Sequence, residues 1–133
     1  MNAVLLIAHA PLAQALRQAA LHVFADAGSD VLALDVQADA APEDSLTQAE
    51  NLLAGCADHD GVLILADVLG ATPCNVARRL LHSGSQRRLV TGVNLPMLLR
   101  ALSYRHEPLA AMTERALTGG QRGMDEIKTP ASA

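Results

Sequence analysis

The chain of 133 residues is long enough for one domain and too short for two. Half of its residues are hydrophobic, and because it has one Phe, one Tyr and no Trp, the core must be built from Leu, Val, Ile, Ala and Met. A formal net charge of −4 without a basic run argues against nucleic-acid binding, and no uncharged apolar stretch reaches the roughly 18 residues of a membrane span. We therefore expect a cytoplasmic protein with no direct membrane insertion.

Apolar strands and amphipathic helices alternate along the chain. Continuous apolar runs indicate strands covered on both faces, and apolar residues at helical spacing, bounded by Gly and Pro, indicate the helices between them. The predicted elements are a strand at 3–8, a helix from Pro11 to Gly28, a strand at 31–36, a helix capped by Asp44 or Ser45 and running to Cys56, a strand at 62–66, a helix opened by Pro73 and running to Leu81, a strand at 88–93, a short helix at 96–102 and a last helix from Leu109 to Ala116.

This alternation predicts an α/β fold with a doubly wound, mostly parallel sheet of four or five strands and helices on both faces. We assign residues 1–120 to the domain and residues 121–133 to a flexible C-terminal tail. In such sheets, ligands bind beyond the carboxyl ends of the strands, near the switch in strand order. The search for a site therefore focuses on three loops, at 9–11, 67–73 and 93–97.

His9 is the histidine best placed for chemistry, since it follows the first strand directly and precedes a helix. Asp67 ends the third strand, which should neighbour the first in a sheet of this kind. Its carboxylate can accept a hydrogen bond from one ring nitrogen of His9, which fixes the tautomer and leaves the other nitrogen free to attack. Capping of a turn is an equally good interpretation of Asp67. Solvent-facing side chains are expected for the other four histidines, His22, His59, His82 and His106.

The segment from Asp67 to Pro73 has the composition of an anion-binding loop. Gly70 lets the backbone turn, and Thr72 offers a hydroxyl group. The helix that begins at Pro73 directs free amide N–H groups and its positive dipole end toward the loop. A phosphoryl group needs such positioning more than it needs covalent help, although many strand-to-helix turns share this pattern.

The motifs indicate neither a metal site nor a cofactor. The metal-binding patterns H-x-x-x-H and H-E-x-x-H are absent, as are the nucleotide-binding patterns G-x-x-x-x-G-K-[ST] and G-x-G-x-x-G. Cys56 and Cys74 lack a C-x-x-C spacing, so we interpret both as small buried thiols.

Three segments resemble the signature segments of the mannose/fructose-type IIA family (EIIA, type 4) of the phosphotransferase system (PTS). They are Leu6-Ile7-Ala8-His9, then Asp67-Val68-Leu69-Gly70-Ala71-Thr72-Pro73-Cys74-Asn75, then Gly92-Val93-Asn94-Leu95-Pro96-Met97-Leu98. The resemblance covers about residues 1–125, with the segments in the right order and with the right gaps. The third segment is the most specific, because no general fold rule requires G-V-N-[LI]-P-M.

The resemblance implies a phosphotransferase that works as a phosphocarrier in sugar transport. The phosphoryl group would come from the phosphocarrier protein HPr, reside on His9 as phosphohistidine, and pass to a IIB protein, with Asp67 as the partner of the histidine. It also implies a doubly wound fold and a homodimer, with a C-terminal strand exchanged between subunits in some members. The residues implied to hold the phosphoryl group are Leu69, Gly70, Ala71 and Thr72, and those of the supporting loop are Asn94 and Pro96.

The sequence departs from the family pattern at three positions. Ala10 stands where Gly commonly follows the histidine, Val68 where a hydroxyl residue is frequent, and Cys74 where Phe is common. None of these changes removes His9 or Asp67, so we expect phosphoryl transfer to persist.

Three other interpretations stay open. A strand that ends in a histidine also occurs in small chelatases that insert metal into tetrapyrroles, but these need a second metal-binding His or Glu in an apolar groove, and His59 and His82 are not placed for that role. The chain could instead be a stand-alone regulatory IIA protein whose phosphorylation state controls a partner. It could also be an α/β binding domain in which His9 is inert.

Overall fold

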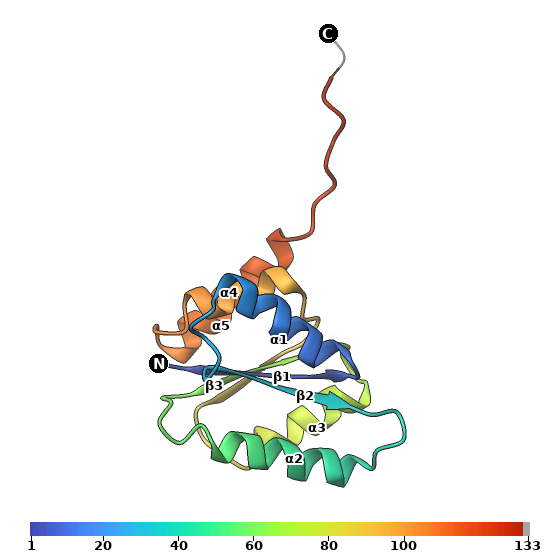
Figure 1. Ribbon diagram of the computed structural model, residues 1–133, viewed down its shortest axis with the longest axis vertical. Helices are drawn as coiled ribbons and strands as arrows, with labels where there is room; N and C mark the ends of the chain where they lie inside the picture. Colours follow the sequence, from blue (N-terminus) through green and yellow to red (C-terminus); the bar gives the residue numbers. More distant parts are fainter. Residues whose placement is uncertain (132–133) are drawn as a thin grey trace.

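The computed structural model describes residues 1–131, so residues 132 and 133 of the predicted tail lie outside the described residues. The described chain forms three layers, with a sheet between two groups of helices (Figure 1). Within residues 1–131, no helix is both long enough and apolar enough to cross a membrane.

The middle layer is a sheet of four parallel strands. They are β1 (Ala3–His9), β2 (Val31–Val36), β3 (Val62–Ala66) and β4 (Arg87–Val90), in the spatial order β2-β1-β3-β4. β1 pairs with both β2 and β3, so that Leu6 lies opposite Ala33 on one side and Leu65 on the other. The strand order changes direction between β1 and β3, and this is where a doubly wound sheet places its ligand.

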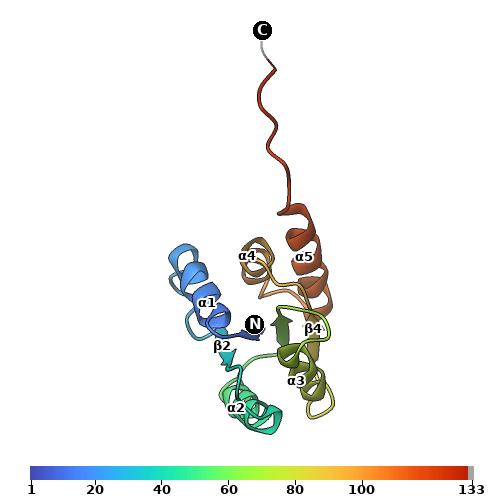
Figure 2. The same ribbon diagram turned by 90° about the vertical axis from the view of Figure 1, so that its right-hand side faces the viewer.

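Helices cover both faces of this sheet. α1 (Leu12–Val23), α4 (Leu95–Ser103) and α5 (Leu109–Arg122) lie on one face, and α2 (Pro42–Ala54) and α3 (Thr72–Leu80) lie on the other (Figures 1 and 2). The predicted doubly wound α/β fold is confirmed, with four strands that are all parallel.

β1 shows why an uninterrupted apolar run forms the central strand. Val4, Leu6 and Ala8 join the core under α1, α4 and α5. Leu5 and Ile7 join the core under α2 and α3, because successive side chains of a strand point to opposite faces. All five side chains are fully buried, and each Leu or Ile contributes about 1.5–3 kcal/mol by leaving water. The strand that carries His9 is therefore held by a hydrophobic core on both faces of the sheet.

The start of α2 differs from the prediction. The helix begins at Pro42, with Ala41 as an extended N-cap residue, so neither Asp44 nor Ser45 caps it. Proline suits the first turn of a helix because that turn leaves its N–H groups without partners anyway. Glu43 and Asp44 lie in this first turn instead, where the helix dipole favours negative charge.

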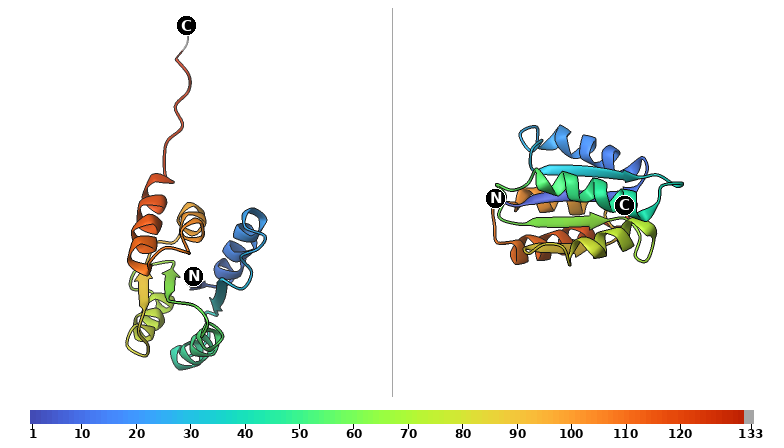
Figure 3. Two further views of the ribbon diagram at one scale, coloured as in Figure 1. Left: turned by 90° about the vertical axis from the view of Figure 1, so that its left-hand side faces the viewer. Right: turned by 90° about the horizontal axis from the view of Figure 1, so that it is seen from below.

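Three other boundaries move as well. α1 ends at Val23 rather than at Gly28, and β4 ends at Val90 because Gly92, with φ +79°, turns the chain away from the sheet. α5 continues to Arg122, two residues past the assigned domain end. Residues 123–131 then extend away from the three layers (Figure 3).

One histidine prediction is wrong. The side chain of His59 is only 14% exposed, and its Nε2 lies 2.8 Å from Asp30 Oδ1. Arg105 Nε donates a hydrogen bond of 3.0 Å to the other oxygen of Asp30, so the histidine belongs to a half-buried polar cluster at the amino end of the sheet. The three histidines that are exposed as predicted are His22, His82 and His106.

Candidate functional site

His9 and Asp67 meet at the carboxyl ends of two paired strands. The register of β1 and β3 places Ile7 opposite Ala66, so the next residues of both strands emerge at the same edge. Asp67 Oδ2 accepts a hydrogen bond from the backbone N–H of His9 at 2.9 Å, and lies 2.7 Å from His9 Nδ1. A carboxylate at this position selects the tautomer with hydrogen on Nδ1, which leaves a lone pair on Nε2.

The two side chains differ in exposure. That of His9 is 54% exposed, whereas that of Asp67 is 7% exposed, so the imidazole faces solvent from a buried carboxylate support. Burial of Asp67 opposes its ionisation, but hydrogen bonds from the His9 backbone, the His9 ring and the Val68 N–H outweigh this burial and lower the pKa of the carboxyl group below its ordinary value. Asp67 is therefore a negative charge at neutral pH.

The loop after β3 turns sharply before it enters α3. The Ala71 N–H donates to the Val68 carbonyl at 3.2 Å, which closes a four-residue turn. Gly70 holds the third position of that turn with φ +85°, as type II turns require. A Cβ at Gly70 would meet no atom within 4 Å, so the backbone conformation, not space, calls for glycine there. Asn75 ties the turn to α3, because its side-chain Nδ2 donates to the Gly70 carbonyl at 3.2 Å.

The amino end of α3 supplies free hydrogen-bond donors. α3 begins at Thr72 with Ala71 as an extended N-cap residue that makes no side-chain cap, and Thr72 is exposed. Among residues 1–131, the amide N–H groups of Leu69, Gly70 and Thr72 make no hydrogen bond, whereas that of Ala71 is used by the turn. Such free N–H groups and the dipole of the helix together suit an anion.

His9 and Thr72 line one cavity of about 310 Å³. Its other lining residues belong to β2, to the connection from β2 to α2 and to the start of α2, and they are Val36, Gln37, Ala38, Ala40 and Pro42. These residues were not among the site residues predicted from the sequence, although β2 ends at the same edge of the sheet as β1, with Val36 opposite His9. The cavity is thus bounded by the first turns of both α2 and α3.

Asn94 ends the loop after β4 and Pro96 lies in the first turn of α4, and both residues contact α5 or its C-cap. Asn94 Oδ1 accepts from the Met97 N–H at 2.8 Å and caps α4, while its Nδ2 donates to the Gly120 carbonyl of α5 at 3.1 Å. Pro96 packs closely against Gly123.

The same loop contacts the site through its backbone. The Gly92 N–H donates to the Asp67 carbonyl at 2.9 Å, and the Val93 N–H donates to the Ala66 carbonyl at 3.0 Å. Asn94 and Pro96 are therefore placed to support Asp67 indirectly. Gly92 and Asn75 are the supports that the sequence argument overlooked, and the only signal for them was their presence in the quoted segments.

Among the described residues, His9 and Asp67 have no third His, Cys, Asp or Glu side chain arranged with them as a metal site. Within residues 1–131, no group of three or more His, Cys, Asp or Glu side chains is arranged to hold a metal ion. His59 is bonded to Asp30 at the opposite end of the sheet, and Cys56 and Cys74 are buried free thiols, as expected. The geometry around His9 therefore provides one nucleophilic nitrogen, one carboxylate and a set of anion donors.

Comparisons with known proteins point to one family. The family model EIIA-man, described as PTS system fructose IIA component, matches residues 3–116. The PTS system fructose-specific EIIA component of Bacillus subtilis (strain 168) is 31% identical over 80 residues, which is 54% of this chain and 54% of that protein. The match thus spans about half the length of this curated relative.

Solved structures share the fold over nearly the whole chain. The mannose/sorbose-specific IIA subunit from Enterococcus faecalis superposes with a TM-score of 0.89 at 23% identity, covering 99% of this chain and 98% of that one. A phosphotransferase system component EIIA from Streptococcus agalactiae superposes with a TM-score of 0.83 at 22% identity, covering 95% and 97%. At these identities the likeness establishes the fold, and the site rests on its own geometry.

Proposed function

Because this chain belongs to the mannose/fructose-type IIA family of the phosphotransferase system, we propose that it accepts a phosphoryl group from phospho-HPr on His9 and passes it to a IIB protein. The observation that carries the proposal is the 2.7 Å contact between His9 Nδ1 and Asp67 Oδ2, beside a loop with free amide donors. The role places the protein in the cytoplasm as a phosphohistidine carrier.

In the proposed transfer, the lone pair on His9 Nε2 attacks phosphorus. A new N–P bond forms as the bond between phosphorus and the donor atom of HPr breaks, and that electron pair stays with the donor. The imidazole ring gains positive charge while Nδ1 keeps its hydrogen, and the Asp67 carboxylate at 2.7 Å stabilises that charge. Transfer to the IIB protein runs through the same geometry in reverse.

The loop after β3 would hold the phosphoryl oxygens. The amide groups of Leu69, Gly70 and Thr72 and the Thr72 hydroxyl are the available donors, and the dipole of α3 adds positive potential. The Ala71 N–H, which closes the turn to Val68, preserves the shape of the loop. Ala71 thus takes part through its position in the turn.

Two partners and a homodimer complete the proposal. Val68 and Leu69 are 55% and 67% exposed beside the loop, and they offer an apolar contact to HPr and to the IIB protein. We propose the homodimer from the family resemblance; residues 123–131, which follow α5, form no strand within this single chain.

The test is phosphorylation of the purified protein by phosphoenolpyruvate, enzyme I and HPr. We expect an acid-labile, base-stable label on the wild type and none on His9→Ala. His82→Ala is the matched control, since His82 is exposed at the end of α3 and outside the cavity, and it should be labelled like the wild type. Equal labelling of His9→Ala and wild type would refute His9 as the phosphorylated residue. If neither protein is labelled, the proposal that phospho-HPr is the donor is refuted.

A further inference from the structure

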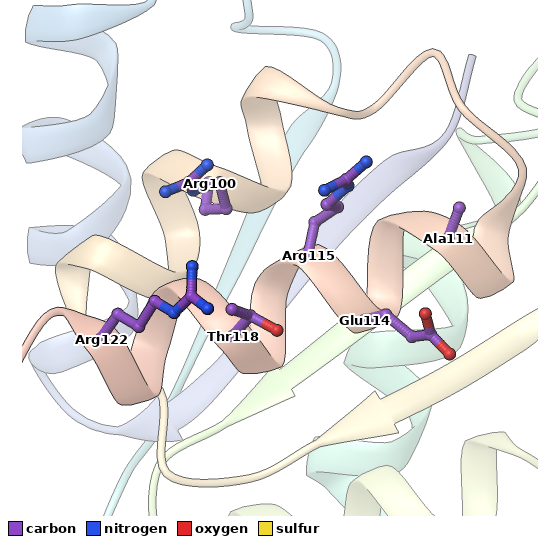
Figure 4. Close-up of a pocket in the computed structure, with 6 residues that line it drawn as sticks. All are labelled: Arg100, Ala111, Glu114, Arg115, Thr118 and Arg122. Atoms are coloured by element: carbon purple, nitrogen blue, oxygen red, sulfur yellow. The ribbon is translucent and has the colours of Figure 1, made fainter.

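A second pocket lies on the outer side of the α4–α5 pair, away from His9. Its volume is about 310 Å³, and it shares no lining residue with the His9 cavity. Arg100 reaches into it from α4, and the other lining residues come from α5 (Figure 4). They are Ala111, Glu114, Arg115, Thr118 and Arg122.

The lining residues of α5 follow the spacing of a single helical face. Glu114, Thr118 and Arg122 are four residues apart, so their side chains stand one above another along the helix. At about 1.5 Å per residue, the face from Glu114 to Arg122 is roughly 12 Å long, which matches a small organic molecule. Arg115 lies on the same side, one position after Glu114.

The close approach of α4 and α5 holds Arg100 over this face. A Cβ added to Gly119 would lie 2.6 Å from Arg100 Cβ and 2.8 Å from its Cγ, so the stem of Arg100 crosses α5 where only a glycine fits. Arg100, Thr118 and Arg122 thereby lie on the same side of the α4–α5 pair, where all three line the pocket (Figure 4). Its position is a result of helix packing and needs no ligand to be present.

These arginines have no acidic partner within the described part of the chain. Arg100 and Arg122 make neither a salt bridge nor a side-chain hydrogen bond among residues 1–131, and Arg115 stacks on the Tyr104 ring at 4.7 Å. Other arginines of the chain form salt bridges, as Arg79 does with Glu43 and Arg105 does with Asp30. Three of the ten Lys and Arg residues of an acidic chain thus line one small pocket.

We propose that this pocket binds a small phosphomonoester that also carries hydroxyl groups. The guanidinium groups of Arg100 and Arg122 and the Thr118 hydroxyl supply donors for the phosphate at one end of the face. Glu114, at the other end, supplies an acceptor for hydroxyl groups and repels a second negative charge. The ligand therefore has its charge at one end and its hydroxyl groups at the other, as a hexose 6-phosphate has.

The test is titration of the unphosphorylated protein with glucose 6-phosphate at low salt, followed by amide chemical shifts and by calorimetry. We expect saturable binding with the largest shifts at the amides of Thr118, Gly119 and Arg122. Arg100→Gln and Arg122→Gln should each weaken binding about tenfold or more, since each removes a charge-assisted contact. Arg88→Gln is the matched control, because Arg88 is exposed, lines neither pocket and carries the same charge, and its variant should bind like the wild type.

Glucose and inorganic phosphate test separately whether the phosphate and the sugar of the ligand contribute to binding. Glucose should not bind, and inorganic phosphate should bind more weakly than glucose 6-phosphate. Absence of saturable binding, shifts confined to residues 69–72, or an equal effect of Arg88→Gln would each overturn the site. Equal affinity for inorganic phosphate would overturn the assignment of an organic ligand. No outcome depends on labelling of His9, so failure here and failure of the phosphocarrier proposal are distinguishable.

Discussion

At the scale of single residues, Asp67 does two tasks with one oxygen. Oδ2 accepts from both the backbone N–H and the ring of His9, while Oδ1 accepts from the Val68 N–H. The ring is thereby fixed relative to the main chain of its own residue, so imidazole orientation and strand position cannot vary independently. An amide at this position would have to turn one N–H group toward another donor.

The lowered pKa of Asp67 predicts how acid affects stability. Its hydrogen bonds favour the ionised form in the folded state, so their contribution is complete above the unfolded pKa of about 3.9 and is lost as pH falls through the lower folded value. We expect the difference in unfolding free energy between wild type and Asp67→Asn to shrink as the pH falls from about 3.9 through the lower folded pKa of Asp67. Urea unfolding across this range measures it, with the exposed Asp58→Asn as control; a difference that grows with acid would contradict the assignment.

We expect the rate of phosphoryl transfer to depend on a single hydrogen bond made by Asn75. Its side chain holds the Gly70 carbonyl and with it the turn that presents the loop amides. Loss of this hydrogen bond, worth about 1 kcal/mol, should slow phosphoryl transfer up to about fivefold in Asn75→Ala and lower the unfolding free energy by no more than about 1 kcal/mol. Rapid-quench labelling by phospho-HPr measures the rate. An unchanged rate would mean that the turn keeps its shape without Asn75.

At the scale of elements, the α4–α5 pair depends on glycines. Gly119 allows the stem of Arg100 to lie directly on α5, and Gly120 does the same for Met97. Asn94 joins the two helices from the adjoining loop, whose backbone reaches Asp67. Packing of this pair therefore bears on the position of the Asp67 carboxylate.

Gly119→Ala tests this packing. The added methyl would collide with Arg100 Cβ, a part of the side chain that cannot swing away, and overpacking of this kind costs about 1–3 kcal/mol. Alanine has a higher helix propensity than glycine, which offsets this cost by up to about 1 kcal/mol. We therefore expect a net decrease in the free energy of unfolding measured in urea. Gly28→Ala, whose new methyl would have Arg17 as nearest contact at 3.8 Å, should be nearly neutral. Equal effects of both changes would argue against close packing of α4 on α5.

Elements whose identity is set by their own residues could be predicted from the sequence. The strands at 31–36 and 62–66 have their predicted bounds, because burial on both faces demands a continuous apolar run. The start of α2 was missed because proline replaced a polar cap, and the end of β4 because Gly92 turns within an apolar segment. The meeting of His9 and Asp67 followed from strand order. Two features could not be predicted, because they depend on tertiary packing and leave no local sequence pattern. They are the side of the cavity formed by the β2–α2 connection and the hydrogen bond from Asn75 to the Gly70 carbonyl.

At the scale of the whole molecule, two surfaces differ in chemical character. Val68 and Leu69 are exposed at the carboxyl edge beside His9, whereas three arginines line a pocket on the outer side of α4 and α5. These two surfaces suit different chemistry, an apolar protein contact and an anionic small molecule.

Leu69→Ser tests the apolar contact with HPr. Leu69 is 67% exposed, so its replacement should leave the unfolding free energy nearly unchanged. Loss of its burial against a partner should raise the KM for phospho-HPr about tenfold with little change in kcat. Leu117→Ser, which alters an exposed leucine of α5, is the control and should leave the KM unchanged. An effect on kcat alone would assign Leu69 to the loop rather than to docking.

The direction of β1 in the sheet places the amino terminus and His9 at opposite ends of the strand. Met1 precedes β1 and His9 ends it, so seven extended residues, roughly 20 Å, separate the chain's amino group from the imidazole. A tether or fused domain attached at Met1 would stand at the far end of the sheet and leave the imidazole facing outward. Immobilised by that end, the protein would present its reactive edge to any carrier that arrives from solution.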